Sequence, residues 1–137
     1  MKKRTKAREY AVQMMYQAEM TELLPEEVVS TFWRSFEGII EDTADFAEQL
    51  FSNAYLRRAE HDGMVTQFLK DSWTFERLGE MERCILRVGL DELLYCGTPK
   101  YAVLNDYVTL TRRFTDEKTA AFVNGIMESI HKNFALE

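Results

Sequence analysis

Apolar side chains recur at the spacing of an α-helix along almost the whole chain, and this pattern constrains the fold more than any other feature. In the first segment they occupy one helical face: Ala7, Ala11, Met14, Met15 and Ala18. No segment alternates at a period of two residues for long enough to predict a strand. Only two prolines, Pro25 and Pro99, interrupt 137 residues. The sequence therefore predicts an all-α fold.

The apolar pattern and the turn residues predict six or seven helices joined by short loops. The expected helices are a first ending near Thr21, a second from Pro25 to about Gly38, a third over about 43–60, a short fourth after Gly63, a fifth over about 80–95 and two after Pro99. The fifth is apolar on two sides, so we expect it to be central. We expect one domain over residues 1–137, built from two small packed helical bundles (1–71 and 72–137) joined near Ser72-Trp73-Thr74.

A few residues of the expected helices are typical of packing rather than of a site. Arg87 and Glu92, in the central helix, are interpreted as internal polar ties. Gly125, beside Asn124 in the last helix, is expected to allow another helix to approach closely.

Several classes of protein are disfavoured by the sequence. No window approaches the ~20 apolar residues of a membrane-spanning helix, and no secretory leader is recognisable. There is no glycine-rich phosphate loop or nucleophile elbow, and His61 and His131 lack neighbouring ligands at metal-binding spacing. Cys84 and Cys96 fall in one expected helix, roughly 18 Å apart and beyond disulfide reach. We expect a cytoplasmic protein with reduced thiols that is not an enzyme and has no cofactor or metal site.

Five of the 17 lysines and arginines lie within the first eight positions, although the whole chain has a net charge of −6. These residues, called the basic arm below, are Lys2, Lys3, Arg4, Lys6 and Arg8. Positive charges in the first turn oppose the helix dipole by ~0.3–1 kcal/mol each, so helix stability does not explain them. Phosphate binding explains these cations, because each neutralised phosphate releases counterions. The arm predicts a polyanion partner, with Arg4 and Arg8 presenting two guanidinium groups along one face; the alternative is a solvated tail.

A second, smaller basic group surrounds the start of the last expected helix. It consists of Arg112, Arg113 and Lys118. If the basic arm folds near this helix, the two groups form one positive patch on an otherwise acidic molecule. Phe122 is the aromatic residue nearest to that patch, and single-stranded RNA is often held by stacking a base on such a ring. Its spacing also fits plain core packing, so both interpretations of Phe122 stay open.

Six segments of the chain together resemble a known family. They are Lys6-Ala7-Arg8-Glu9 with Ala11-Val12-Gln13 and Tyr16; Trp73 with Arg77-Leu78; Glu82-Arg83-Cys84-Ile85-Leu86-Arg87; Asp91-Glu92-Leu93-Leu94-Tyr95; Pro99-Lys100-Tyr101-Ala102-Val103-Leu104-Asn105-Asp106; and Phe122-Val123-Asn124-Gly125. In order and spacing, across almost the whole chain, they are similar to the NusB family of bacterial transcription antitermination factors.

The resemblance implies an all-helical fold of two small bundles and no catalysis. It implies binding to the boxA element of nascent RNA together with NusE, a small-subunit ribosomal protein. It also implies assembly with RNA polymerase and other Nus factors, which suppresses termination, notably in ribosomal RNA operons. The expected RNA-binding residues are Lys3, Arg4, Lys6, Arg8, Lys118 and Phe122. Tyr16 and Glu82 match positions implicated in the family's RNA-dependent and NusE-dependent function.

The chain departs from the family pattern at four positions. Thr5 stands where arginine is common, and Asp106 replaces the usual glutamate. Lys118 occupies a position that is often acidic, and Ala121 one that is often lysine. These departures imply a shifted RNA footprint.

Two other interpretations remain open. One is an RNA-binding module related to the N-terminal region of ribosomal RNA cytosine methyltransferases. The other is a helical interaction module whose homodimer hides the basic patch.

Overall fold

The computed structural model describes residues 3–70 and 74–135, with side chains as far as Phe134. Over these residues the chain forms seven α-helices, one 3-10 turn and no strand, which confirms the all-α prediction. The elements are α1 (Lys3–Thr21), α2 (Pro25–Trp33), α3 (Glu41–Leu56), α4 (Arg58–Phe68), the turn η1 (Phe75–Arg77), α5 (Glu80–Tyr95), α6 (Lys100–Phe114) and α7 (Glu117–Ala135).

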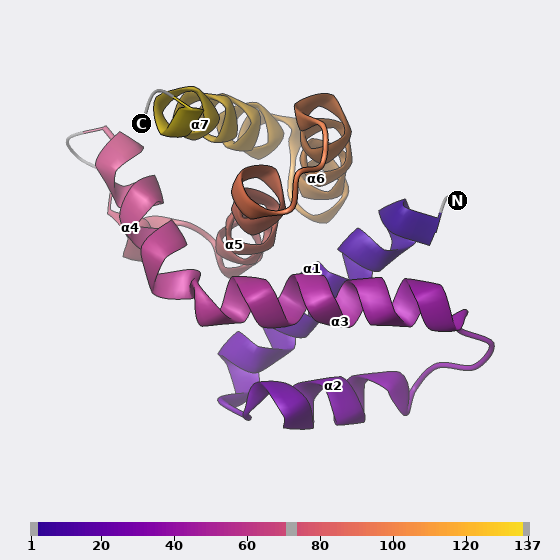
Figure 1. Ribbon diagram of the computed structural model, residues 1–137. Helices are drawn as coiled ribbons and strands as arrows, with labels where there is room; N and C mark the ends of the chain where they lie inside the picture. Colours follow the sequence, from indigo (N-terminus) through magenta and orange to yellow (C-terminus); the bar gives the residue numbers. More distant parts are fainter. Residues whose placement is uncertain (1–2, 71–73, 136–137) are drawn as a thin grey trace.

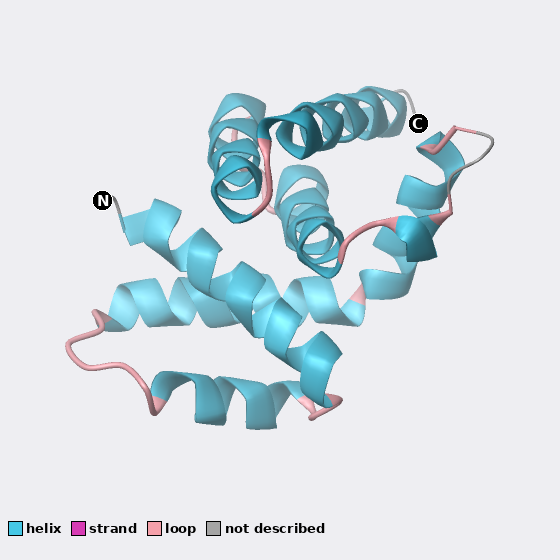
Figure 2. Ribbon diagram, turned by 180° about the vertical axis from the view of Figure 1, so that it is seen from behind, coloured by secondary structure: helices cyan, strands magenta, loops and turns pink. Residues whose placement is uncertain are grey.

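The helices form two groups that pack across each other. Figure 1 shows α1, α2 and α3 on one side and α5, α6 and α7 on the other, while α4 runs from the end of α3 towards α7. The groups meet where α1 and α3 contact α5 (Figure 2). The expected joint at Ser72 and Trp73 lies outside the described residues, and α4 contacts α5 and α7 as well as α3. The division at residues 71 and 72 therefore stays a prediction.

Helix α5 is the central element, as its two apolar sides predicted. Every residue from Cys84 to Leu93 is buried, including the charged Arg87, Asp91 and Glu92. Because a buried charge is costly unless it is paired, each of the three has a partner. Arg87 binds Asp62 of α4 through Nε and Nη2 at 2.8 and 2.7 Å. These contacts confirm the internal role expected for Arg87.

The break between α3 and α4 differs from the expectation. We predicted a third helix continuing to about residue 60 and a new one after Gly63, but the break lies at Arg57, and Gly63 is inside α4. The reason is tertiary. Restarting the helix at Arg58 turns His61 into the interior, where its Nε2 lies 2.8 Å from Oδ2 of Asp91, and the Arg57 guanidinium reaches the same carboxylate at 3.0 Å. The local apolar spacing cannot show a break that a residue on another helix stabilises.

The close helix approach occurs at Gly89 of α5 and not at Gly125. A Cβ at Gly89 would lie 2.9 Å from Cε of Met127 and 3.2 Å from Cγ of Tyr107, both in fully buried side chains. A Cβ at Gly125, which is exposed, would meet nothing within 4 Å. The expectation for Gly125 is therefore wrong. Gly89 is the position where α6 and α7 pack so closely against α5 that they require the absence of a side chain.

Two further observations bear on the excluded classes. Neither cysteine forms a disulfide: Cys84 is buried and Cys96 is exposed. No helix within residues 3–70 and 74–135 has the length and hydropathy needed to cross a bilayer.

Gly89→Ala is expected to lower the free energy of unfolding by about 1–3 kcal/mol, because the core around Met127 and Tyr107 must shift to accept a methyl group. Gly63→Ala is the matched control. A Cβ there meets open space, so the higher helix propensity of alanine should raise stability by about 0.5–1 kcal/mol. Urea unfolding followed by circular dichroism measures both variants, and equal effects would contradict the packing argument.

Candidate nucleic-acid interface

The exposed end of the basic arm consists of Lys3 and Arg4, in the first turn of α1. The Arg4 guanidinium carbon lies 4.0 Å from the centroid of the Phe46 ring on α3, a cation–π geometry. Both cations border a hollow of about 460 Å³ at the start of α3, where Asp42 and Asp45 also lie. Lys2 is outside the described residues. From Lys3 onward the arm is thus folded as helix, with Lys3 and Arg4 at the surface.

Arg8 is the member of the basic arm that the structure removes from the surface. Its side chain is only 6% exposed. Nε and Nη2 donate to the Glu92 carboxylate at 2.8 and 2.7 Å, and Nη1 donates to Oδ2 of Asp106 at 2.7 Å. The prediction that Arg4 and Arg8 present two guanidinium groups along one outer face is therefore wrong. The donors of Arg8 are committed to two carboxylates of its own chain, so it has no free fork for a phosphate.

Glu92 is the centre of a buried polar cluster that joins three helices. Its side chain is 0% exposed and also accepts hydrogen bonds from the Tyr107 hydroxyl at 2.8 Å and from Thr98 at 3.0 Å. Burial, and then the charge of Glu92, raise the pKa of Tyr107 well above its ordinary value, so the hydroxyl remains a donor. Burial alone would lower the pKa of Arg8, but the hydrogen bonds and charge of Glu92 raise it. The internal role expected for Glu92 is confirmed.

The polar cluster also fixes the first turns of α1 against α6. Thr5 donates from Oγ1 to Oδ2 of Asp106 at 3.0 Å, and the same oxygen accepts from Arg8. Thr5 and Asp106 are two of the departures from the family pattern, and here they contact each other. Because this turn is anchored on one face, Lys3 and Arg4 are held on another.

Lys6 brings the basic arm next to the second basic group. The Glu9 carboxylate lies 3.7 Å from Nζ of Lys6 and accepts from both terminal nitrogens of Arg113, on α6, at 3.1 and 3.4 Å. Arg112 instead pairs with the exposed Glu117 at the start of α7. Lys6 and Arg113 therefore meet at one carboxylate, but this contact is with α6; the joint positive patch, which required the arm to fold near the last helix, stays a prediction.

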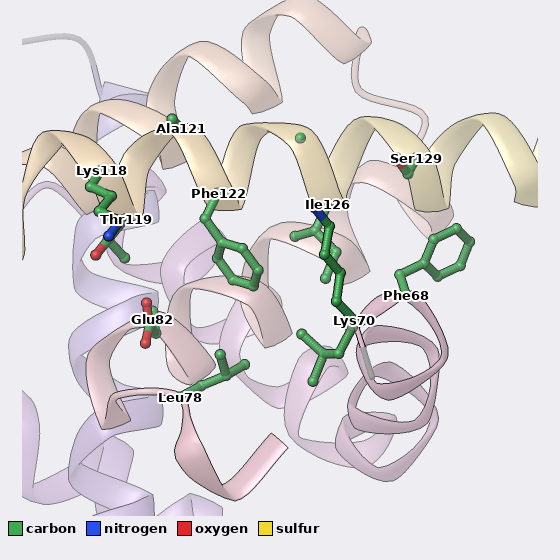
Figure 3. A pocket seen from close by; sticks show the side chains of 12 residues that line it. Phe68, Lys70, Leu78, Glu82, Lys118, Thr119, Ala121, Phe122, Ile126 and Ser129 are labelled. Carbon is green, nitrogen blue, oxygen red and sulfur yellow. The ribbon is translucent and has the colours of Figure 1, made fainter. Parts of the chain in front are cut away.

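A groove lies beside the start of α7 and brings together three of the predicted site residues. It has a volume of about 670 Å³ and includes Lys118, Phe122 and Glu82 in its walls (Figure 3). The half-buried Phe122 ring points into the groove and also packs against the core, so its packing role is confirmed and base stacking stays a prediction. Tyr16 is a partly exposed residue of α1 and does not line the groove.

Helix caps set the positions of Glu82 and Lys118. The Glu82 carboxylate accepts a hydrogen bond from the backbone N–H of Gly79, which caps the start of α5. At the start of α7, Oδ1 of Asp116 accepts from the Thr119 N–H at 2.7 Å, and this bond, with nearby Lys118, lowers the pKa of Asp116. Lys118 is thus exposed on the first turn of α7. The capping role of Glu82 was missed, although its spacing of three residues from Gly79 is a recognisable signal.

The far wall of the groove was not predicted. Phe68, Leu69 and Lys70, at the end of α4, face the residues of α7 across it (Figure 3). Phe68 and Leu69 are half-buried and also pack against the core. No local signal could have found them, because their neighbours on α7 are distant in the sequence. Among the residues described here, no group of His, Cys, Asp and Glu could hold a metal ion.

Comparisons with known proteins agree with this architecture. The family model described as "NusB family" matches residues 5–132. This chain belongs to the NusB family. The transcription antitermination protein NusB of Anaeromyxobacter dehalogenans is 30% identical over 128 residues, covering 93% of this chain and 89% of that one. The corresponding protein of Macrococcus caseolyticus is 34% identical over 142 residues, covering 96% and 98%.

A solved structure of the antitermination factors NusB and NusE in complex with double-stranded RNA has the same fold. It matches with a TM-score of 0.88 and 28% sequence identity, covering 97% of this chain and 98% of that chain. The all-α arrangement of two packed groups is therefore that of the NusB family.

Arg8→Ala is expected to lower the free energy of unfolding by about 3–5 kcal/mol, because it leaves the charge of Glu92 buried without its main partner. Arg4→Ala is the matched control, since it removes an exposed arginine from the same helix and should cost under about 1 kcal/mol. Urea unfolding of both variants measures the difference. Equal costs would show that the buried pair is not what anchors α1.

Proposed function

We propose that this NusB-family chain is an RNA-binding transcription antitermination factor that is not an enzyme. It binds the boxA element of nascent ribosomal RNA transcripts together with NusE. In the assembly with RNA polymerase and other Nus factors it suppresses termination. The observation that carries the proposal is the group of exposed cations on α1 and α6 of a chain with net charge −6, in a fold that a solved complex of NusB and NusE with double-stranded RNA shares.

The RNA follows the exposed cations of the basic arm and the start of α7, and each residue has a distinct role. Lys3, Arg4 and Lys6 pair with phosphates, since all three keep donors at the surface of α1. At the start of α7, the exposed Lys118 supplies a further charge, and the Phe122 ring offers a face on which a base can stack. Arg8 is not in this set, because its role is to anchor α1.

NusE binds beside the RNA, with the groove at α7 as part of its docking surface. The groove combines half-buried apolar side chains such as Phe68 with the carboxylate of Glu82. A surface of this kind is typical of protein interfaces, where an apolar centre is bordered by polar groups. Tyr16 extends the contact surface along α1. The protein partner thereby completes the site for RNA.

The two alternative functions are less well supported. The curated relatives described above are antitermination proteins, and the chain covers 89% and 98% of their length, which favours this role over a methyltransferase module. Light scattering distinguishes a homodimeric interaction module. A dimer that neither NusE nor boxA RNA changes would favour that alternative.

Arg4→Ala is expected to weaken binding of a single-stranded boxA RNA by about 1 kcal/mol and to reduce the slope of log affinity against log salt by about 0.7, the value for one lost phosphate contact. Lys132→Ala, in the last turn of α7, should leave the slope unchanged, because that end of the helix lies far from the start of α1 (Figure 1). Titrations at several salt concentrations, with NusE present, measure both. An unchanged slope for Arg4→Ala would exclude the arm from the RNA site.

Phe68→Ala is expected to weaken NusE binding by about 1–2 kcal/mol, because it removes apolar surface from the groove. Leu56→Ala is the control, since Leu56 is an exposed apolar residue that does not line the groove. Calorimetric titration of NusE into each variant measures the affinities. If the two variants bind NusE equally well, the partner docks on another face.

A further inference from the structure

The surface between α1 and α6 contains two cations that share one carboxylate. The Glu9 side chain is only 8% exposed, yet it lies 3.7 Å from Lys6 and 3.1 Å from Arg113. Both cations remain open to solvent, with side-chain exposures of 41% and 47%. The cluster therefore has a net charge of +1 that faces outward.

Stability alone does not account for the second cation. A nearly buried carboxylate needs one counter-charge, and a second cation beside the first adds like-charge repulsion. The C-terminal turn of α6 favours a positive charge through the helix dipole, but this effect applies equally to Arg112, which turns away to Glu117. Of these two arginines, Arg113 is the one directed to α1, where it donates to Glu9 beside Lys6 of the basic arm.

The geometry of Arg113 leaves part of its guanidinium available. A guanidinium has five N–H donors, and Glu9 accepts from the two terminal nitrogens. Nε and the outer hydrogens are left for another acceptor. Because the pair with Glu9 orients the planar group, less side-chain entropy is lost when a phosphate binds.

Arg113 also lies on α6 between the basic arm and the start of α7. The first turns of α1 contact α6 through Thr5, Arg8 and Glu9, and α6 leads through a short loop to Lys118 on α7. Both ribbon views show the N-terminal part of α1 beside α6 (Figures 1 and 2). A cation at this point connects the basic arm with the start of α7.

We propose that Arg113 binds a phosphate of the single-stranded RNA next to Lys6, and that Glu9 is the positioning residue that holds its guanidinium in place. This inference rests on the proposed RNA-binding function. It makes α6 a part of the RNA surface and assigns a role in binding to a carboxylate, which by charge alone would repel RNA.

The test compares Arg113→Ala with Arg112→Ala, which removes the same charge from the neighbouring position. The probe is a fluorescent single-stranded boxA RNA, titrated at several salt concentrations with NusE present. We expect Arg113→Ala to weaken binding roughly fivefold and to reduce the salt slope by about 0.7. Arg112→Ala should keep the wild-type slope, and Arg113→Lys, which retains the charge but not the planar group that pairs with Glu9, should recover the slope and only part of the affinity.

A second variant separates positioning from general electrostatics. Glu9→Gln removes a negative charge. If only the overall electrostatic attraction to RNA mattered, this variant would bind RNA more tightly. The positioning role predicts binding weakened about twofold, because the Arg113 guanidinium loses its charged partner. Circular dichroism confirms that each variant is folded. This variant also keeps the proposal testable if Arg113→Ala does not fold.

The outcomes also separate this inference from the proposed function. If Arg4→Ala reduces the salt slope and Arg113→Ala does not, the RNA-binding function stands and the role of Arg113 is overturned. Tighter RNA binding by Glu9→Gln overturns the positioning role. If the wild-type protein with NusE does not bind the RNA at all, the proposed function fails and this inference fails with it.

Discussion

The buried pair between Arg8 and Glu92 is the interaction on which the rest of this structure depends. Two charged side chains without solvent are stable together only if their remaining donors and acceptors are satisfied. Here Asp106 accepts a further hydrogen bond from Arg8, and Tyr107 and Thr98 donate to Glu92. The cluster joins α1 of one helical group to α5 and α6 of the other, so it fixes how the two groups cross. An apolar contact at this place could slide, whereas a bidentate guanidinium–carboxylate pair sets direction and register.

The exposure of the other cations of the basic arm follows from this anchor. Because Arg8 and Thr5 hold one face of α1 against Asp106, the other faces of the same turns carry Lys3, Arg4 and Lys6 outward. Within the basic arm, Arg8 thus anchors the helix, whereas Lys3, Arg4 and Lys6 remain at the surface. The anchor also places Glu9 where it meets Arg113, which lets a basic group from a distant part of the chain continue the surface.

The groove at α7 is a second consequence of how the halves pack. Its walls come from the end of α4, the start of α5 and the first turns of α7. The break at Arg57 directs α4 across α5 towards α7, and the shared partner Asp91 stabilises that direction through His61 and Arg57. The short loop after α6 joins the helix that carries Arg113 to the helix that lines the groove.

Local patterns were sufficient for the order of the helices, although not for every boundary. The start of α2 at Pro25 and the extent of α5 followed from spacing and capping, because helix propensity and amphipathicity act within a few residues. Three features were decided only by tertiary structure: the burial of Arg8, the break at Arg57 and the close approach at Gly89. Each depends on a partner far along the chain, such as Asp106, Asp91 or Met127. A one-dimensional pattern shows that Arg8 is charged, but whether it faces water or a buried carboxylate is set by the free energy of packing one helix on another.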